Sequence, residues 1–145
     1  MGCEGTVNIF YELHRDIPRE GPGNRESTRK AYESLNLPAT PSILDVGCGP
    51  GDQTLELAKL SKSNVVAVDI QESFLAVLKH RAAQEGLSDY ITPVQASMKN
   101  MNFPELSFDL IWSEGAIYIM GFAHGLAQWR QFLKPRGYMV VSELS

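Results

Sequence analysis

Glycines cluster in one short segment of the sequence, Gly47–Gly51, which reads Gly-Cys-Gly-Pro-Gly and directly follows the apolar run Ile43–Val46. Glycine reaches positive φ without steric cost and lets a ligand approach the backbone closely. The apolar run predicts a buried strand, and residues 53–60 carry apolar side chains at helical spacing. The turn between them would therefore present backbone amides to a ligand at the start of a helix.

Two classes of cofactor fit a glycine-rich turn of this kind, and the residues beside it distinguish them. A dinucleotide-binding turn needs a third glycine three residues after the second, whereas Asp52 stands at that position. Its carboxylate would repel a pyrophosphate, and Asp45 supplies a second negative group two residues before the first glycine. Both carboxylates favour a ligand with a positive end over a nicotinamide dinucleotide.

Five segments of the chain, in order, resemble the motifs of class I S-adenosylmethionine-dependent methyltransferases. Ile43–Gly51 resembles motif I, and the other segments are residues 65–70, 94–98, 108–114 and 133–137. The resemblance covers about the last hundred residues, and five motifs in register are far more specific than one glycine turn. It implies S-adenosylmethionine as the cofactor and S-adenosylhomocysteine as its product.

The function implied by this resemblance is methyl transfer to a small-molecule acceptor. Residues 111–118 and the loop 21–23 further resemble a poorly characterised bacterial and archaeal subgroup of these enzymes. The fourth predicted strand ends without the Asn/Asp-Pro-Pro-Tyr signature of amino methylation on nucleobases, which disfavours that class of acceptor. The alternatives are a module that binds the cofactor without turnover and, less favoured, a nicotinamide-dependent oxidoreductase.

The resemblance implies roles for the residues expected around the adenosyl half of the cofactor. Asp69, at the end of the second predicted strand, would accept hydrogen bonds from both ribose hydroxyls, and its alternative role is to cap the next helix. Ile70 and Met98 would flank the adenine, although either could belong to the core. Ser97 stands where many of these enzymes have an aspartate that binds the adenine amino group, and a hydroxyl can also accept that bond.

The methionyl half would be held by backbone groups and by the N-terminal arm. Gly47 and Ser113 would offer carbonyl oxygens to the ammonium group, and Arg19 could bind a carboxylate through its guanidinium. Cys48 is interpreted as a small residue that permits close approach, because no partnering His-Asp arrangement makes it a nucleophile. The full set of predicted cofactor-binding residues is Asp45, Gly47, Cys48, Gly49, Gly51, Gln53, Asp69, Ile70, Ser97, Met98, Ser113, Arg19 and Gly21.

Methyl transfer requires mainly that the protein align the donor and the acceptor, so a catalytic base is optional. Glu114 is the first candidate for a base because it ends a predicted parallel strand that faces the crevice. Its alternative role is a contact to the cofactor ammonium or a packed polar residue. Tyr118 and His124 are the next candidates, and the scattered histidines predict no metal site.

From Ser42 onward, apolar runs alternate with helical patterns, which predicts an α/β fold with a doubly wound, mostly parallel sheet. The Rossmann-like order of the resembled family is 3-2-1-4-5. The expected strands are residues 43–46, 64–69, 90–95, 108–113 and 138–143. Helices are expected over residues 53–60, over a segment that holds Phe74 and Ala82, and over a segment that holds Leu126, Trp129 and Leu133.

Residues 1–41 predict a helical arm over the cofactor crevice, and residues 42–145 the cofactor-binding core. In the arm, Ile9, Phe10 and Leu13 suggest a short helical or extended segment. A second helix is expected over residues 27–35, after a loop that includes Gly21-Pro22-Gly23.

The predicted strand order leaves residues 138–144 as an edge with unpaired amides. The domain of the resembled family usually continues past this strand, so we expect a domain truncated after its fifth strand. The unpaired edge predicts a homodimer through it.

The chain has 145 residues, which suits a single domain. Its net charge of -4 argues against a nucleic-acid partner, which would need a clustered basic face. The longest apolar stretch, residues 115–127, is too short to span a bilayer, so no membrane partner is expected. With 2 cysteines and no disulfide framework, the sequence predicts a cytoplasmic protein.

Overall fold

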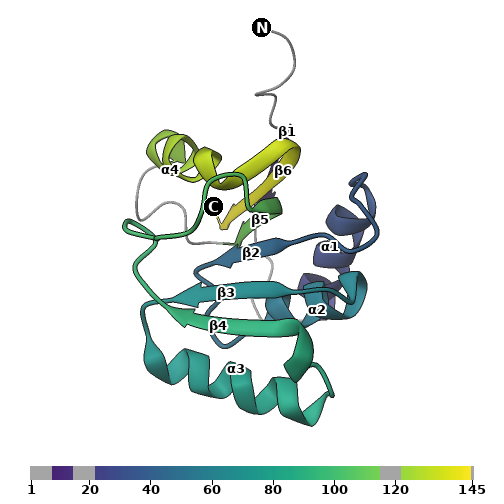
Figure 1. Ribbon diagram of the computed structural model, residues 1–145. Coiled ribbons are helices and arrows are strands. Elements are labelled where there is room, and N and C mark those ends of the chain that lie inside the picture. The colour runs from purple at the N-terminus through teal and green to yellow at the C-terminus, as the bar shows by residue number, and fades with distance from the viewer. Residues whose placement is uncertain (1–7, 15–21, 115–121, 145) are drawn as a thin grey trace, which may run out of the picture.

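A six-stranded parallel sheet forms the centre of the protein, in the order β1-β6-β5-β2-β3-β4 (Figure 1). The computed structural model describes residues 8–14, 22–114 and 122–144. The strands are β1 Asn8–His14, β2 Ile43–Val46, β3 Val65–Asp69, β4 Ile91–Gln95, β5 Phe108–Glu114 and β6 Leu133–Leu144.

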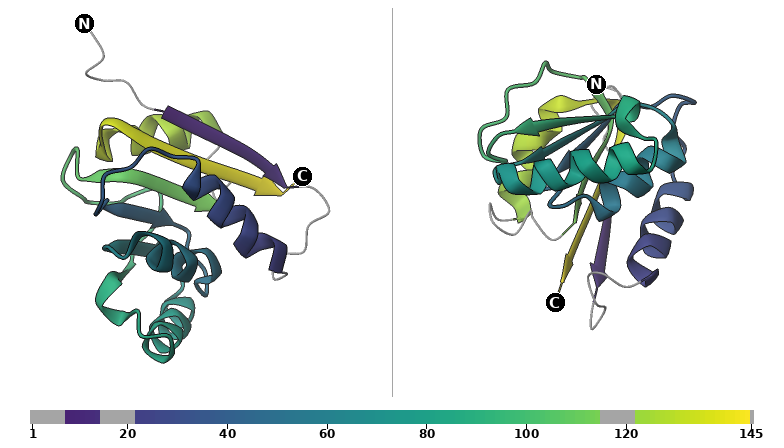
Figure 2. Two further views of the ribbon diagram at one scale, coloured as in Figure 1. Left: turned by 90° about the vertical axis from the view of Figure 1, so that its right-hand side faces the viewer. Right: turned by 90° about the horizontal axis from the view of Figure 1, so that it is seen from below.

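Helices cover both faces of this sheet (Figure 2). The helices are α1 Pro22–Glu33, α2 Asp52–Ser61, α3 Glu72–Gln84 and α4 Phe122–Trp129, with short 3-10 turns at Ser88–Tyr90 and Arg130–Phe132. One apolar cluster packs α1, α2 and α3 against the sheet, and a second packs α4 against the opposite face. None of these helices combines the length and the apolar character needed to cross a bilayer.

The central strand β2 is buried along its whole length, as expected for a strand covered on both faces. Ile43 belongs to the core cluster on the α2 side, and Leu44 and Val46 belong to the cluster on the α4 side. Side chains alternate between faces along a strand, so two independent cores form on one short segment. Asp45 is the polar exception, with 0% of its surface exposed.

The expected α/β fold and the order of its five core strands are confirmed, since 3-2-1-4-5 corresponds to β4-β3-β2-β5-β6. The expected edge is wrong. Strand β1 pairs with β6 in parallel from Asn8 opposite Tyr138 to His14 opposite Leu144. Of the helical and extended alternatives for this part of the arm, the extended one is correct. The β-formers in Ile9–Tyr11 suit a strand, and β6 offers it a ladder of backbone groups.

Because β1 covers this side of β6, the reason for a homodimer through the edge at residues 138–144 is removed. Two helix boundaries also differ from expectation. Pro22 begins α1 instead of lying in a loop, since the first turn of a helix needs no amide donor from it. Leu133 begins β6 instead of ending a helix, because α4 stops at Trp129 and a 3-10 turn follows.

Candidate functional site

The glycine turn is built from left-handed backbone conformations. Gly47, Gly49 and Gly51 have φ values of 72°, 58° and 105°. The amides of Gly47 and Cys48 both donate to the carbonyl of Val68, at 2.8 and 2.9 Å. These bonds tie the turn across the carboxyl ends of β2 and β3, where ligands bind in open α/β sheets.

Two of these glycines differ in what lies beside them. A Cβ on Gly49 would meet nothing within 4 Å, so the backbone there faces open space. A Cβ on Gly51 would lie 2.4 Å from Cδ1 of Leu78 on α3. Gly51 therefore allows α3 to pack against the turn, whereas Gly49 leaves room for a ligand beside the backbone.

Asp69 connects the glycine turn to the start of α3. Its Oδ2 accepts a hydrogen bond from the amide of Gly49, and its Oδ1 accepts one from the amide of Gln71, each at 2.9 Å. The N-cap residue of α3 is Gln71, not Asp69. Each carboxylate oxygen can accept more than one hydrogen bond. Asp69 is thus held in one orientation and keeps acceptor capacity for a ligand hydroxyl.

Ile70 lies next to this carboxylate and is 63% exposed. On the neighbouring strand, Gln95 pairs with Asp69 and donates from Nε2 to the carbonyl of Ile70 at 3.2 Å. Ser97 follows β4, and its Oγ accepts a hydrogen bond from the amide of Lys99 at 3.1 Å. Ile70 and Ser97 therefore both follow carboxyl ends of paired strands, at the same edge of the sheet as the glycine turn.

Met98 is half-buried against the core on the α4 side. Its carbonyl accepts a hydrogen bond from Nε1 of Trp129 at 3.2 Å. Trp129 is fully buried, so this bond anchors the loop after β4 to the end of α4. Of the two roles expected for Met98, a core residue or a contact to the adenine, its side chain fits the core role. Its backbone lies in the loop that follows β4.

Asp45 of β2 is held by hydrogen bonds from the start of α2. Its Oδ2 accepts a hydrogen bond from Oγ1 of Thr54 at 2.5 Å, and Nε2 of Gln53 lies 3.3 and 3.4 Å from its two oxygens. The same Nε2 donates to the carbonyl of Cys48 at 3.1 Å. Asp45 and Gln53 together fix the turn relative to β2 and α2.

Cys48 is 2% exposed, and its Sγ donates to the carbonyl of Gly49. Burial raises the pKa of this thiol far above its usual range, and the carboxylates of Asp45 and Asp69 raise it further. The thiol is therefore protonated at neutral pH, which makes it a poor nucleophile. This agrees with the interpretation of Cys48 as a small residue within the turn.

The carboxyl end of β5 lies next to β2 and contains two predicted site residues. Ser113 is fully buried, and its Oγ has no hydrogen-bond partner within the described ranges. Glu114 ends the strand opposite Ser142 of β6. His124 is exposed on α4. Arg19, Gly21 and Tyr118 lie outside the described residues, so the structure does not place them.

Arg81 of α3 is a contact of the turn that the sequence did not reveal. Its Nη1 lies 2.9 Å from Oδ1 of Asp52 and donates to the carbonyl of Pro50 at 3.2 Å. No local pattern signals this pair, because it depends on how α3 packs on the turn. It also weakens the argument from Asp52 against a dinucleotide, since Arg81 compensates the negative charge.

Comparison with known proteins supplies the evidence that the turn alone lacks. Residues 43–137 match the family model described as methyltransferase domain. The chain is 28% identical over 143 residues to the methyltransferase GfsG of Streptomyces halstedii, covering 96% of this chain and 51% of that protein. It is 29% identical over 143 residues to the ubiquinone/menaquinone biosynthesis C-methyltransferase UbiE of Marinomonas sp., covering 97% and 57%.

The fold is also similar to that of solved structures. The [4+2]-cyclase SpnF superposes with a TM-score of 0.76 at 20% identity, covering 90% of this chain and 50% of that one. The chain thus spans about half the length of the relatives it matches.

The site fits S-adenosylmethionine, the cofactor that the resemblance implied. The match to the methyltransferase family model confirms this cofactor for the family. Gly49 faces open space, Asp69 accepts a hydrogen bond from its amide, and Ile70, the residue after Asp69, exposes an apolar surface. The family model covers well over half of the chain, in the same segments that carry the five motifs. The chain belongs to the class I S-adenosylmethionine-dependent methyltransferases.

Proposed function

We propose that this chain transfers a methyl group from S-adenosylmethionine to a small-molecule acceptor. The observation that carries the proposal is the hydrogen bond from the amide of Gly49 to Oδ2 of Asp69 at 2.9 Å. It joins an open glycine turn to an oriented carboxylate at the ends of two adjacent strands. A ligand that lies against the backbone of the turn and offers a pair of hydroxyls to the carboxylate matches this combination.

The adenosyl half would be bound along the ends of β3 and β4. Asp69 would accept hydrogen bonds from the ribose hydroxyls through capacity that Gly49 and Gln71 leave unused. Ile70 would lose exposed apolar surface against one face of the adenine, which favours binding. Ser97 could accept from the adenine amino group with its second lone pair, and Met98 would offer its backbone amide.

The methionyl half would lie over the glycine turn. Gly47 and Ser113 would offer carbonyl oxygens to the ammonium, and Arg19 would reach the carboxylate from the N-terminal segment. Asp45 and Gln53 would contribute indirectly, by holding the turn in place. Gln53 donates to the carbonyl of Cys48 in the turn and contacts the carboxylate of Asp45. Residues 8–14 form the edge strand β1 instead of a helical part of the arm, and the placement of Arg19 over the crevice stays a prediction.

When bound, S-adenosylmethionine supplies an activated methyl group on a positively charged sulfur. The chain then has to exclude water and align the acceptor with that methyl group, and alignment alone accounts for much of the rate. Glu114 is the first candidate to take a proton from the acceptor, because it ends β5 at the carboxyl edge of the sheet. Tyr118 and His124 follow it as candidates.

The proposal is tested by ligand-dependent unfolding of the wild type and two glycine variants. S-adenosylhomocysteine at a hundred times its dissociation constant should stabilise the wild type by about 2.7 kcal/mol, and NAD should not. Gly49→Ala places a methyl group in the open space beside the turn, so we expect it to abolish this stabilisation.

Gly86→Ala is the matched control. Gly86 also has a positive φ, 72°, and open space around its Cβ position, but it lies at the far end of α3. Both variants should lose about 1 kcal/mol of stability without ligand, the cost of a left-handed alanine. Stabilisation of the wild type by NAD alone, or by none of the ligands, contradicts the proposal.

A second candidate function is cofactor binding without turnover. It is the alternative that the sequence left open, and this fold is compatible with functions other than methyl transfer. Labelled methyl transfer to a panel of small-molecule acceptors separates the two functions. A chain that binds the cofactor tightly but methylates none of them is a binding module. The absence of a nucleic-acid partner and the cytoplasmic location stay predictions from the sequence.

A further inference from the structure

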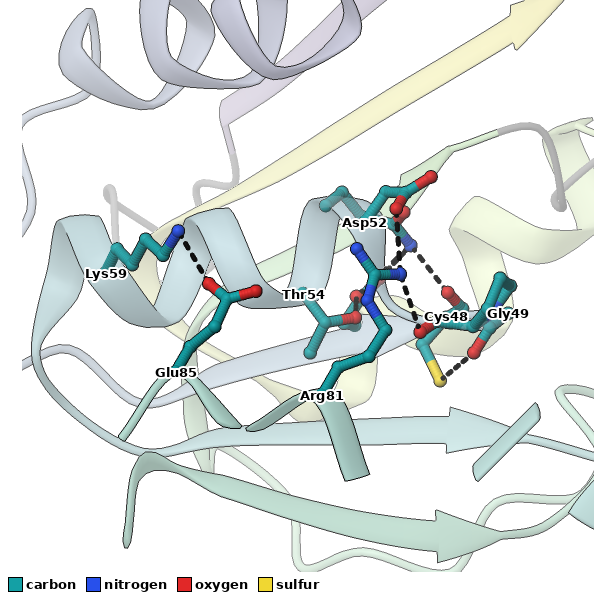
Figure 3. A network of polar contacts seen from close by, with 10 residues as sticks. Cys48, Gly49, Asp52, Thr54, Lys59, Arg81 and Glu85 are labelled. Carbon is teal, nitrogen blue, oxygen red and sulfur yellow. Dashed lines mark hydrogen bonds and ion pairs between the residues drawn. The ribbon is translucent and has the colours of Figure 1, made fainter. Parts of the chain in front are cut away.

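Two ion pairs join α2 to α3 and to its C-cap residue, one at each end of α2 (Figure 3). At the end next to the glycine turn, Asp52 and Arg81 are 2.9 Å apart. At the other end, Lys59 and Glu85 are 2.7 Å apart. All four side chains are partly exposed, with 24–41% of their surface accessible. As ion pairs, the two are closely comparable.

Arg81 does more than its counterpart because it also reaches the backbone of the turn. The same Nη1 that pairs with Asp52 donates to the carbonyl of Pro50, between Gly49 and Gly51. Three residues earlier on the same helix, Leu78 fills the space that a side chain on Gly51 would need. Helix α3 thus holds the turn through one apolar and one charged contact.

The contacts of Arg81 restrict a turn in which Gly47, Gly49 and Gly51 all have positive φ values. Glycine is the most flexible residue, so a turn rich in glycine loses much conformational entropy when it is ordered. A contact that orders the turn before a ligand arrives removes part of that loss from binding. The charge of Arg81 also balances that of Asp52, the first residue of α2.

We propose that Arg81 is a positioning residue that sets the affinity for the cofactor by holding the glycine turn through Pro50 and Asp52. It acts on the turn and not on the cofactor itself. The inference rests on the proposed function for its ligand, whereas the ordering of the turn is a property of the free protein.

The test compares Arg81→Gln with Lys59→Gln, which removes the matched pair at the far end of α2. Isothermal titration with S-adenosylhomocysteine should give an affinity about three- to tenfold lower for Arg81→Gln, and an unchanged affinity for Lys59→Gln. Urea unfolding without ligand should show similar, small losses of stability for both. Equal losses of affinity in the two variants, or none in either, would overturn the proposal.

Two further variants show whether Arg81 acts through its charge. Arg81→Lys keeps a positive charge that can pair with Asp52, so it should recover part of the affinity. Asp52→Asn combined with Arg81→Gln should bind no more weakly than Arg81→Gln alone, because the single change already breaks the pair. A further loss of affinity in the double variant, relative to Arg81→Gln, contradicts action through Asp52.

Hydrogen exchange in the free protein keeps this test separate from that of the proposed function. The amides of Gly47, Cys48, Gly49 and Gly51 are hydrogen-bonded, so a peptide covering residues 44–55 reports on the turn. Arg81→Gln should speed its exchange, and Lys59→Gln should not. If the wild type binds no adenosyl ligand, the proposed function fails, and this measurement still decides whether Arg81 orders the turn. Equal exchange in the two variants would overturn the positioning role.

Discussion

Both ends of α2 carry a left-handed residue, but the two positions tolerate different side chains. The N-cap residue Gly51 has a φ of 105°, and the C-cap residue Lys62 has a φ of 49°. Leu78 occupies the space beside Gly51, whereas Lys62 is exposed. The comparison shows that backbone conformation alone does not require a glycine. At the turn, the requirement comes from the close approach of α3.

The two ends also differ in how their polar groups are satisfied. Beneath the turn, the buried carboxylate of Asp45 depends on Thr54, which is itself fully buried. At the other end, Ser61 is 7% exposed and accepts one hydrogen bond, at 3.3 Å, from the amide of the partly exposed Ser63. Loss of a partner is more costly where water cannot replace it. The turn end is therefore the more constrained of the two.

Gly51→Ala should have the largest effect on stability. The added methyl group would overlap Cδ1 of Leu78, which is fully buried, and alanine is strained at this φ. We expect a loss of about 3 kcal/mol in the free energy of urea unfolding, from overpacking and backbone strain. A loss below about 1 kcal/mol would show that Leu78 moves aside easily and would remove the contrast with Lys62.

Thr54→Val should have the next largest effect. It keeps the shape of the side chain but removes the hydroxyl that donates to Asp45, which leaves a buried carboxylate with one donor fewer. We expect a loss of about 2 kcal/mol in urea unfolding. Ser61→Ala is the matched change at the other end of α2, and it should cost less than half as much. Equal losses at the two sites would contradict the difference in burial.

The Cys48 thiol predicts a dependence of stability on alkaline pH. Its pKa is raised in the folded protein above the usual value of 9.0, so only the unfolded chain releases this proton as the pH rises. Stability from this group is complete below about pH 9 and falls above it, by about 1.4 kcal/mol per pH unit.

Urea unfolding at pH 8 and pH 10 measures this fall, with Cys48→Ala as the control. The difference between the two pH values should be smaller in the variant by about 1 kcal/mol, since other groups titrate in both proteins. The same slope in both proteins would contradict a raised pKa at the turn.

Lys62→Gly should have the smallest effect, and of opposite sign. Glycine adopts the left-handed conformation of Lys62 without a penalty from Cβ, and it commonly ends helices in this way. We expect a gain of up to about 0.5 kcal/mol, because the entropy that glycine adds to the unfolded chain offsets part of the benefit. A loss of stability would indicate that Lys62 contributes contacts beyond its backbone.

Most of the turn was predictable from residues close together in the sequence. The run Ile43–Val46 followed by Gly47–Gly51 indicated a buried strand and a left-handed turn, and Asp69 at the end of the next strand followed from the same pattern. The partners of Asp52 were not predictable, because Arg81 lies 29 residues away in sequence and reaches it only after α3 packs. The pairing of β1 with β6 was missed for the same reason, since its residues are separated by more than a hundred positions.

The sequence by itself determined the α/β class and the position of the glycine turn, because apolar periodicity and the conformational freedom of glycine are local properties. The order of the five core strands was implied by the family resemblance. Only the tertiary structure decided that β1 completes the sheet beside β6, that Leu78 closes the space at Gly51, and that Arg81 holds Pro50 and Asp52. Each of these contacts joins segments that meet only when helices and strands pack, and no local pattern encodes which side chains then come into reach.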